Sequence, residues 1–392
     1  MDSKQLIAQD SASVMQTYGR FPVAIDHGEG ARLYSPEGKQ YIDFTSGIGV
    51  SCLGYGNQKW LSAITEQAKK LAHISNLYYS EPYIKLSQAL TERTGMKRVF
   101  FANGGGEANE GMIKLCRKYS YDKYGEGRST ILTLRDSFHG RTVTTLAATG
   151  QDVFHQYFFP FTQGFQYAAA NDLASILSLD DGTVCAVMLE LVQGEGGVLP
   201  LNYDFVQSLK KLCEEKDWLL AVDEVQTGVG RTGSLFCFQQ YDLLPDVCSF
   251  AKGIGGGLPL AGIMANEKTE RVLTPGTHAT TFGGNPICCA GALSVLEQLD
   301  ETLLKSVREK GAYLREKISA MPGVMEVRGM GLMLGIGLAD ELNAGVLVQK
   351  MLEQGLLCLT AGHNTIRLLP PLVITQAEMD AGLAIMASVL EA

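Results

Sequence analysis

The chain has 392 residues, of which 46% are hydrophobic and 19% are charged, and its formal net charge at pH 7 is -9. A chain of this length exceeds the usual limit for one hydrophobic core, so we expect two domains. The acidic balance argues against nucleic acid or an anionic membrane as the main partner, and no apolar run is long enough to cross a bilayer.

The nine cysteines and six histidines are scattered along the sequence. No Cys-x-x-Cys pair occurs, which favours reduced thiols over a disulfide framework. The histidines lack the spacing of metal ligands, so we expect no metal site. The N-terminal residues 1–10 contain an early acid and no apolar core of a signal peptide. These features predict a cytoplasmic protein.

In chain order, the first predicted elements are strand-like runs within residues 30–44, separated by a Ser-Pro-Glu-Gly turn at 35–38. We expect residues 1–50 to pack with a smaller C-terminal domain.

A large α/β domain is predicted over residues 51–289. Four short apolar segments are typical of buried strands, at residues 130–134, 184–189, 219–222 and 246–250. Amphipathic segments such as 203–213 lie between them, which indicates a mainly parallel sheet covered by helices. In such sheets ligands bind at the carboxyl ends of the strands. Polar and glycine-rich groups follow these strands, so we expect the site there.

The first of these groups is the run Gly104, Gly105 and Gly106, which opens a helical pattern over residues 108–121. Free backbone N–H groups at the start of a helix bind phosphate. The nucleotide-binding pattern Gly-x-x-x-x-Gly-Lys-[Ser/Thr] does not occur in the chain. Taken alone, the run is equally compatible with a simple turn.

Charged side chains follow the next strands. Phe138, His139 and Arg141 come after residues 130–134, and Glu195 lies between glycines after residues 184–189. An arginine in such a loop binds a substrate carboxylate or forms a structural ion pair, and the sequence leaves both open.

Asp223 ends the strand at 219–222, where a buried acid needs a cationic partner. The ring nitrogen of a bound cofactor fits that need better than magnesium, because the nucleotide loop is missing. The dinucleotide pattern Gly-x-Gly-x-x-Gly also occurs, at residues 228–233. It carries little weight, because it lies late in the chain and the following residues 234–238 read as extended rather than helical.

Lys252 stands among apolar and glycine residues just after the strand at 246–250. Poor solvation and a nearby cation favour the neutral amine, which is a nucleophile. A surface lysine on a flexible loop is the alternative for this residue taken alone.

The C-terminal residues 290–392 predict a smaller α+β domain. It begins with one long helix over residues 290–320 and ends with a helix that starts from a capping box at residues 375–378. The strands between them are predicted at residues 325–328, 332–338 and 366–369. Arg367 lies in the last of these strands, where it answers a carboxylate of a substrate or of Glu195.

Together these residues resemble the class III pyridoxal-phosphate-dependent aminotransferases, most closely the acetylornithine aminotransferases, over nearly the whole chain. The shared motifs are residues 21–23, 28–31, 75–79, 137–142, 193–197, 223–228, Lys252 and 280–286. The resemblance implies the α/β architecture called fold type I, with a mainly parallel seven-stranded sheet and a smaller α+β domain. It also implies a homodimer with shared active sites, and pyridoxal 5'-phosphate as cofactor.

The resemblance assigns Lys252 to the covalent link with the cofactor and to proton transfer. Asp223 pairs with the pyridinium nitrogen, so that the ring remains an electron sink. Phe138 and Val225 cover the two ring faces, and Gln226 reaches the ring hydroxyl.

The phosphate is assigned to backbone N–H groups of Gly105 and Gly106 and to Thr281 of the partner subunit, and His139 completes the cofactor site. The family has Ser or Thr/Ala where this chain has Gly104 and Gly106, which implies one hydroxyl fewer at the phosphate and a softer loop.

Arg367 and Arg141 are assigned to the carboxylates of glutamate, with Glu195 covering Arg367 when a substrate has only one carboxylate. Ornithine aminotransferases carry a tyrosine where this chain has Ile48, and an apolar residue suits an acylated amine. The expected reaction therefore transfers the amino group of N2-acetylornithine to 2-oxoglutarate, giving N-acetylglutamate 5-semialdehyde and glutamate, a step of arginine biosynthesis.

The sequence leaves other reactions open. Succinylornithine, succinyl-diaminopimelate and ornithine remain possible amino donors. A pyridoxal-phosphate aminomutase or racemase, or a nicotinamide dehydrogenase built on residues 228–233, represents other classes of enzyme.

Overall fold

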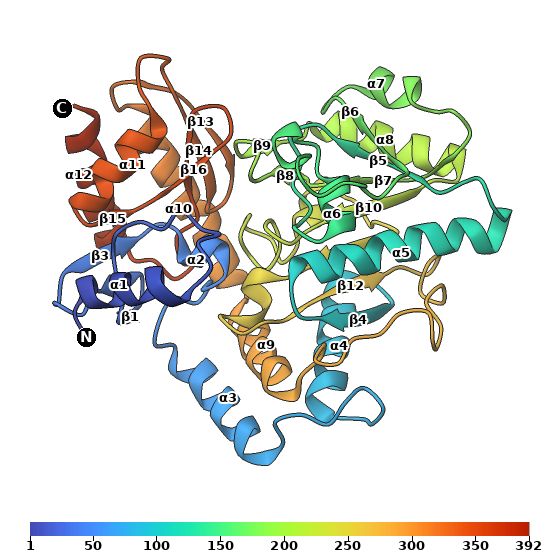
Figure 1. Ribbon diagram of the computed structural model, residues 1–392, viewed down its shortest axis with the longest axis horizontal. Helices are drawn as coiled ribbons and strands as arrows, with labels where there is room; N and C mark the ends of the chain where they lie inside the picture. The colour runs from blue at the N-terminus through green and yellow to red at the C-terminus, as the bar shows by residue number, and fades with distance from the viewer. Residues whose placement is uncertain (392) are drawn as a thin grey trace.

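The computed structural model describes residues 1–391, which form two parts lying side by side (Figure 1). The larger part surrounds a seven-stranded sheet from the middle of the chain. The smaller part combines the C-terminal residues with strands from the N-terminus. This arrangement confirms the predicted large α/β part with a smaller α+β part beside it. The exact domain boundaries remain a prediction.

The large sheet has all its strands parallel except β12. Its order is β4 (Arg98–Ala102), β12 (Ala261–Ala265), β11 (Val247–Phe250), β10 (Leu219–Asp223), β7 (Val184–Leu189), β5 (Thr130–Leu134) and β6 (Phe165–Ala168). The four strands predicted from the sequence are all present. The carboxyl ends of β4, β5, β7, β10 and β11 therefore meet at one edge.

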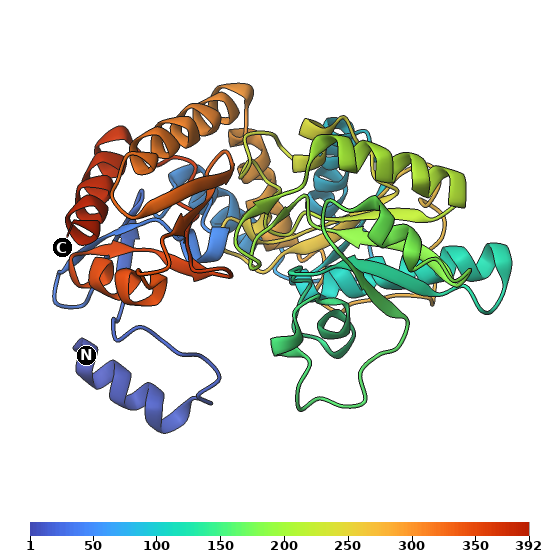
Figure 2. The same cartoon turned by 90° about the horizontal axis from the view of Figure 1, so that it is seen from above.

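Helices cover both faces of this sheet. Alternate residues of β10 point to opposite faces, so that Ala221 packs in the apolar cluster with helix α5, whereas Leu220 and Val222 pack in the cluster with α8. Figure 2 shows these two helices on opposite sides of the strands. The helices of this part are α3 (Gln58–Lys70), α4 (Glu81–Thr94), α5 (Gly105–Tyr124), α6 (Val143–Ala148), α7 (Leu173–Ser178), α8 (Tyr203–Lys216) and α9 (Pro286–Gln298).

The smaller part contains two four-stranded sheets. One has the order β13 (Val324–Met330), β14 (Met333–Leu338), β17 (Thr365–Leu368) and β16 (Leu359–Ala361), and the other joins β1 (His27–Glu29), β2 (Arg32–Tyr34) and β3 (Gln40–Asp43) to β15 (Leu356–Leu357). Its helices are α10 (Glu301–Ser319), α11 (Ala344–Glu353) and α12 (Gln376–Leu390). The remaining elements are the strand pair β8 (Val192–Gln193) and β9 (Leu199–Pro200), helices α1 (Ser3–Ser13) and α2 (Ser46–Gly49), and the 3₁₀ helices η1 (Asp152–Phe154), η2 (Cys237–Tyr241) and η3 (Lys252–Gly255).

Two sequence predictions were wrong. The single helix expected over residues 290–320 is divided between α9 and α10, because Asp300 leaves helical geometry and its side chain accepts from the backbone N–H of Leu303 to start a new helix. Residues 234–238 were expected to be extended, which holds for Phe236 (φ -128°, ψ 144°) but fails at Cys237 and Phe238, which belong to the 3₁₀ helix η2.

Helix α1 lies apart from the body of the molecule in Figure 2, and none of its residues is buried. Within residues 1–391, no helix is both long enough and apolar enough to span a membrane.

Candidate active site

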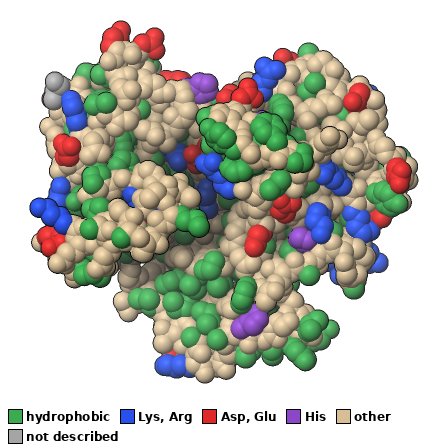
Figure 3. Space-filling model, in the orientation of Figure 1, with side chains coloured by type: hydrophobic (Ala, Val, Ile, Leu, Met, Phe, Trp, Pro, Cys, Tyr) green, Lys and Arg blue, Asp and Glu red, His purple; other side chains and the backbone are tan. Residues whose placement is uncertain are grey.

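A cavity of about 840 Å³ opens at the carboxyl ends of the parallel strands. Figure 3 shows a hollow between the two parts of the molecule, with basic and acidic side chains inside it. The cavity is lined by loops from five strands, so residues far apart in the sequence meet there. Its lining includes Val50, Gly104, Gly105, Gly106, Asn109, Phe138, His139, Arg141, Glu190, Asp223, Val225, Gln226 and Lys252.

The glycine run forms a cradle at the start of helix α5. A Cβ atom on Gly105 would lie 2.8 Å from Cγ1 of Val225, so no side chain fits at this position. Gly104 faces open space and gives the helix no side-chain cap, which leaves the first N–H groups of the helix without a side-chain acceptor there. A 20-residue helix that begins in this way at a cavity wall favours a bound anion.

Asp223 is buried in the wall of the cavity, where it is 3% exposed. Its Oδ2 atom accepts from Nδ2 of Asn109 at 2.7 Å and lies 2.8 Å from Nδ1 of His139. Its Oδ1 atom accepts from the backbone N–H of Val225 at 3.0 Å and from Ser249 Oγ at 3.3 Å. These contacts hold the carboxylate in one orientation and stabilise its charge.

The polar groups of the cavity fit pyridoxal 5'-phosphate. The cradle of glycines suits its phosphate, and the fixed carboxylate of Asp223 suits a cationic ring nitrogen. Two buried polar atoms beside Asp223, Oδ1 of Asn109 and Nε2 of His139, have no hydrogen-bond partner within the described chain. Buried polar atoms in proteins are normally satisfied, so these two indicate a polar ligand or water in the cavity.

Lys252 is placed two residues after the end of β11, on the strand next to β10. Its backbone is left-handed, with φ of 50°, a conformation that costs free energy for a residue with a side chain. Burial, together with the charge of Arg367, lowers the pKa of its amine to about 8 against the opposing effect of Glu195. A large share of the amine is therefore neutral near pH 8.

This pKa predicts how cofactor loading depends on pH. In protein stripped of cofactor, the rate constant for pyridoxal phosphate incorporation should rise about tenfold per pH unit below pH 8, because only the neutral amine attacks an aldehyde. Above pH 8 the rate should level off. Stopped-flow absorbance measured from pH 6 to pH 10 checks this, and a rate that stays flat across that range would contradict it.

A buried ion pair lies beside the cavity. Arg367 on β17 is 3% exposed, and its Nη1 atom donates to Glu195 Oε1 at 2.6 Å and to Gln226 Oε1 at 3.2 Å. Although burial alone would raise it, the charge and hydrogen bond of Arg367 hold the pKa of Glu195 below its ordinary value. The Nε atom of Arg367 has no partner within the described residues. Arg367 is thus paired with a carboxylate and still has an unpaired buried N–H at Nε within the described residues.

Arg141 is exposed at the rim of the cavity. Its guanidinium lies 4.2 Å from the ring centre of Phe154 and 5.4 Å from that of Phe138. The two rings meet edge to face at 5.8 Å. An arginine held against aromatic rings, with no carboxylate paired to it in the described chain, is available to an anionic substrate.

Sequence reasoning missed three residues of this site. Glu190 comes directly after β7, just as Asp223 is the last residue of β10. The argument that used the strand end to find Asp223 could therefore have found Glu190 too. Its carboxylate accepts from the backbone N–H of Phe138 at 3.0 Å and of Gly194 at 3.2 Å, and burial raises its pKa to about 7. Asn109 and Phe154 carried no comparable signal, because their roles depend on contacts between distant segments.

Four predicted site residues do not line the cavity. Glu195 and Arg367 lie beside it, where Arg367 contacts the cavity residue Gln226, whereas Thr281 and Ile48 lie outside it. Thr281 is exposed and lines a separate small cleft with residues such as His73 and Asn76. Ile48 is 42% exposed and does not line the cavity, whereas Val50, two residues on, does. The roles of Thr281 and Ile48 stay predictions.

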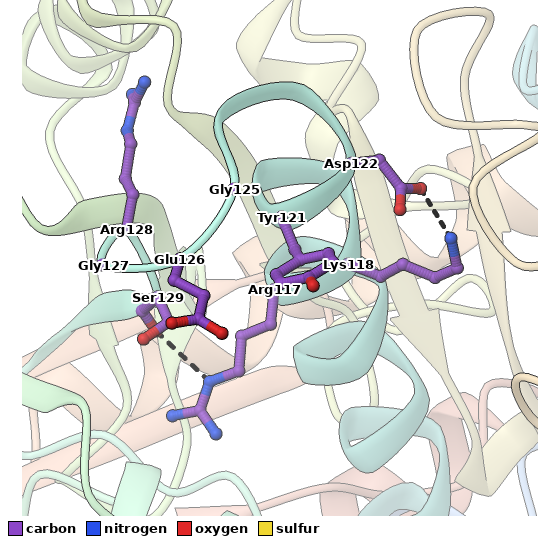
Figure 4. A pocket seen from close by; sticks show the side chains of 9 residues that line it. All are labelled: Arg117, Lys118, Tyr121, Asp122, Gly125, Glu126, Gly127, Arg128 and Ser129. Carbon is purple, nitrogen blue, oxygen red and sulfur yellow. Dashed lines mark hydrogen bonds and ion pairs between the residues drawn. The ribbon is translucent and has the colours of Figure 1, made fainter.

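A second concavity, of about 510 Å³, lies at the end of helix α5 (Figure 4). Its two arginines already bind backbone oxygens: Arg117 donates to Ser129, and Arg128 donates to Val184. Lys118 pairs with Asp122 at 2.5 Å. Because these cations already have partners, this surface hollow is a poor candidate for a ligand site.

The sequence matches the family described as "Aminotransferase class-III" over residues 13–390. It is 47% identical over 391 residues to a curated protein named acetylornithine aminotransferase from Haemophilus ducreyi, covering 100% of this chain and 99% of that protein.

Solved structures agree in fold. An ornithine aminotransferase from Toxoplasma gondii, crystallised in the presence of oxidised glutathione and described as showing partial occupancy of PLP at its active site, has a TM-score of 0.95 at 30% identity and covers 99% of this chain and 94% of its own. An acetylornithine aminotransferase from Elizabethkingia anophelis has a TM-score of 0.88 at 32% identity, covering 100% of this chain and 99% of its own. Both specificities thus share this fold, so the substrate must be argued from side chains.

Proposed function

Since the chain belongs to the class III aminotransferases, we propose that it transfers the amino group of N2-acetylornithine to 2-oxoglutarate with pyridoxal 5'-phosphate as its cofactor. The products are N-acetylglutamate 5-semialdehyde and glutamate. The observation that carries this proposal is one cavity lined by a buried carboxylate, a lysine of lowered pKa and a glycine cradle, with an arginine–glutamate pair beside it.

When bound, pyridoxal phosphate supplies an aldehyde that exchanges amino groups and a ring that accepts electrons from the reacting carbon. The protein supplies the rest. Asp223 presents a fixed negative charge where the ring nitrogen must stay protonated. Lys252 Nζ, neutral in a large fraction near pH 8, takes up and returns a proton within the cavity.

Arg367 and Glu195 together suit two substrates of different charge. With glutamate or 2-oxoglutarate, the substrate's own carboxylate replaces Glu195 on the Arg367 guanidinium. With acetylornithine, whose reacting end carries no carboxylate, Glu195 remains paired at 2.6 Å and no buried cation is left without a partner. Arg141 then binds the single α-carboxylate.

Ile48 predicts the choice between acylated and free ornithine. A charged α-amino group needs a hydrogen-bond acceptor, which isoleucine does not provide and a tyrosine hydroxyl does. Changing Ile48→Tyr should raise the kcat/KM ratio of ornithine over acetylornithine at least about tenfold, the effect of one hydrogen bond to a charged group. Ile48→Phe, of similar size but without the hydroxyl, is the matched control. If the kcat/KM ratio of ornithine over acetylornithine were the same in Ile48→Tyr and Ile48→Phe, residue 48 would not explain the choice of amino donor.

The direct test of the proposed function is turnover by the purified wild-type protein. It should consume 2-oxoglutarate only when an amino donor is present, and should prefer acetylornithine to ornithine. Formation of a product that does not depend on 2-oxoglutarate would indicate an aminomutase or racemase instead.

We also propose a homodimer that completes the site. Two segments that meet near Thr281 expose large apolar side chains: Leu77, Tyr78 and Tyr79 are 85%, 67% and 94% exposed, and Phe282 is 61% exposed. Such a patch is typical of an interface. Thr281 would reach the phosphate of the neighbouring subunit from this surface. A cytoplasmic location remains a prediction from the sequence.

A further inference from the structure

The dinucleotide-like motif Gly228–Gly233 takes no part in the cavity. In the described chain the motif is followed by a turn and the short 3₁₀ helix η2 rather than by an α-helix, and its backbone packs against the smaller part of the molecule. A Cβ atom on Gly230 would lie 2.9 Å from side-chain atoms of Leu299 and Leu372. The backbone N–H of Leu332 donates to the carbonyl of Arg231 at 3.0 Å. The glycines therefore allow two parts of the chain to approach closely, which is a different use from binding a pyrophosphate.

Arg231 in this motif is 2% exposed and has an unusual set of partners. Its Nη1 atom donates to the carbonyl oxygens of Leu332, at 3.0 Å, and Pro370, and its Nη2 atom donates to Ser46 Oγ at 3.2 Å. All these acceptors are uncharged, and burial lowers its pKa to about 10. A buried guanidinium without a carboxylate is costly, so it persists only where its geometry is needed.

Ser46 belongs to a left-handed turn, residues Ser46–Gly49. The four φ angles in order are 42°, 62°, 64° and 79°. Left-handed geometry is a genuine outlier for a β-branched residue such as Ile48, and it needs support from the surroundings.

Support for the turn comes from two sides. The carboxylate of Asp43 accepts from the backbone N–H groups of Thr45 at 2.7 Å and Ser46 at 3.0 Å. Ser46 Oγ donates to the carbonyl of Leu369 at 2.6 Å while accepting from Arg231. Nε of Arg231 also lies 4.0 Å from the place where a Cβ of Gly49 would be.

A further acceptor of Arg231, the carbonyl of Pro370, is three residues from Arg367. The same guanidinium therefore contacts the turn that carries Ile48 and the end of the strand that carries the carboxylate-binding arginine. We propose that Arg231 is a positioning residue for substrate recognition: it holds the turn Ser46–Gly49 and the end of β17 in a fixed relation, and so fixes Ile48 relative to Arg367. This inference rests on the proposed function.

The test compares Arg231→Lys and Ser46→Ala with the wild-type holoenzyme. In Arg231→Lys, we expect the KM for 2-oxoglutarate to rise about tenfold and the preference for acetylornithine over ornithine to fall about tenfold, as expected for the loss of hydrogen bonds from a charged group. The value of kcat should change less than about threefold, because no catalytic group is touched. Ser46→Ala leaves the charge in place and should lower the preference alone.

Arg308→Met is the matched control. Arg308 donates to the carbonyl of Gly233 in the same motif but contacts neither the turn nor β17. The Arg308→Met variant should have a lower melting temperature, but an unchanged KM for 2-oxoglutarate and an unchanged preference for acetylornithine over ornithine. If Arg231→Lys also lowers only the melting temperature, the inference is overturned. If Arg231→Lys does not fold, an unchanged preference in Ser46→Ala overturns it.

Failure of the proposed function gives a different result. The wild-type protein would then reject acetylornithine, while the KM for 2-oxoglutarate, measured with the amino donor it does use, still reports whether Arg231 positions Arg367.

Discussion

Replacing Lys252 with alanine should abolish turnover. General acid–base catalysis by one positioned side chain contributes roughly 10²–10⁴ in rate, and the covalent link to the cofactor adds to this. Without the amine, the cavity keeps Asp223, the glycine cradle and Arg141, with Arg367 beside it, so the variant should still bind pyridoxal phosphate noncovalently. Borohydride treatment should attach the cofactor to the wild-type protein but not to the variant, as measured by intact mass.

Lys268→Ala is the matched control for this experiment. Lys268 is partly buried and pairs with Asp217 at 3.1 Å, but it lies outside the cavity. Its variant should keep full activity and the borohydride-dependent mass increase. Addition of methylamine should restore some activity to Lys252→Ala, because the deletion leaves space for a small amine. If Lys252→Ala turned over at the wild-type rate, the assignment of the cavity as the active site would be wrong.

Local sequence patterns predicted most of the large sheet. Each of the strands β5, β7, β10 and β11 is a short apolar run followed by a polar or glycine-rich group, and both features depend only on neighbouring residues. From these strand positions, the rule that ligand sites lie at the carboxyl ends of strands predicts Asp223 and Lys252 at one edge. The division of residues 290–320 was missed, because the apolar pattern continues across the break and the capping side chain of Asp300 decides it.

The contacts that complete the site could not be read from local patterns. Asn109 reaches Asp223 across 114 positions of sequence, and Arg231 reaches Ser46 across 185. Such pairs depend on how the sheet and the smaller part dock, which is a tertiary property. The left-handed turn Ser46–Gly49 is a further example, since isoleucine has no preference for that geometry and only its surroundings impose it.

The motif Gly228–Gly233 shows that a local pattern can also suggest a binding site that the tertiary structure does not form. Its spacing matches a dinucleotide fingerprint, but the fingerprint depends on a strand before it and a helix after it. The strand β10 is present, whereas the residues after the motif form a turn and the 3₁₀ helix η2. The glycines serve close packing against Leu299 and Leu372 instead.

Changing Asp223→Asn should lower kcat on the order of 10²–10³-fold, the usual effect of removing one preorganised electrostatic contact from an active site. The amide is neutral, so nothing anionic remains to keep a ring nitrogen protonated. Its NH₂ group would also face donors, because Asn109, His139 and the N–H of Val225 all donate toward this carboxylate.

The spectrum of the bound cofactor separates these effects from simple unfolding. Asp223→Asn should bind pyridoxal phosphate at Lys252 with an altered absorbance, whereas an unfolded variant would not bind it. The matched control is Asp246→Asn: Asp246 accepts from the backbone N–H of Leu220 at 2.9 Å, at the opposite end of the same strand pair. That variant disturbs a partly buried contact and should melt earlier, but its kcat should remain that of the wild type. Equal kcat losses in the two variants would mean that the charge at position 223 acts through stability, because only Asp223 lines the cavity.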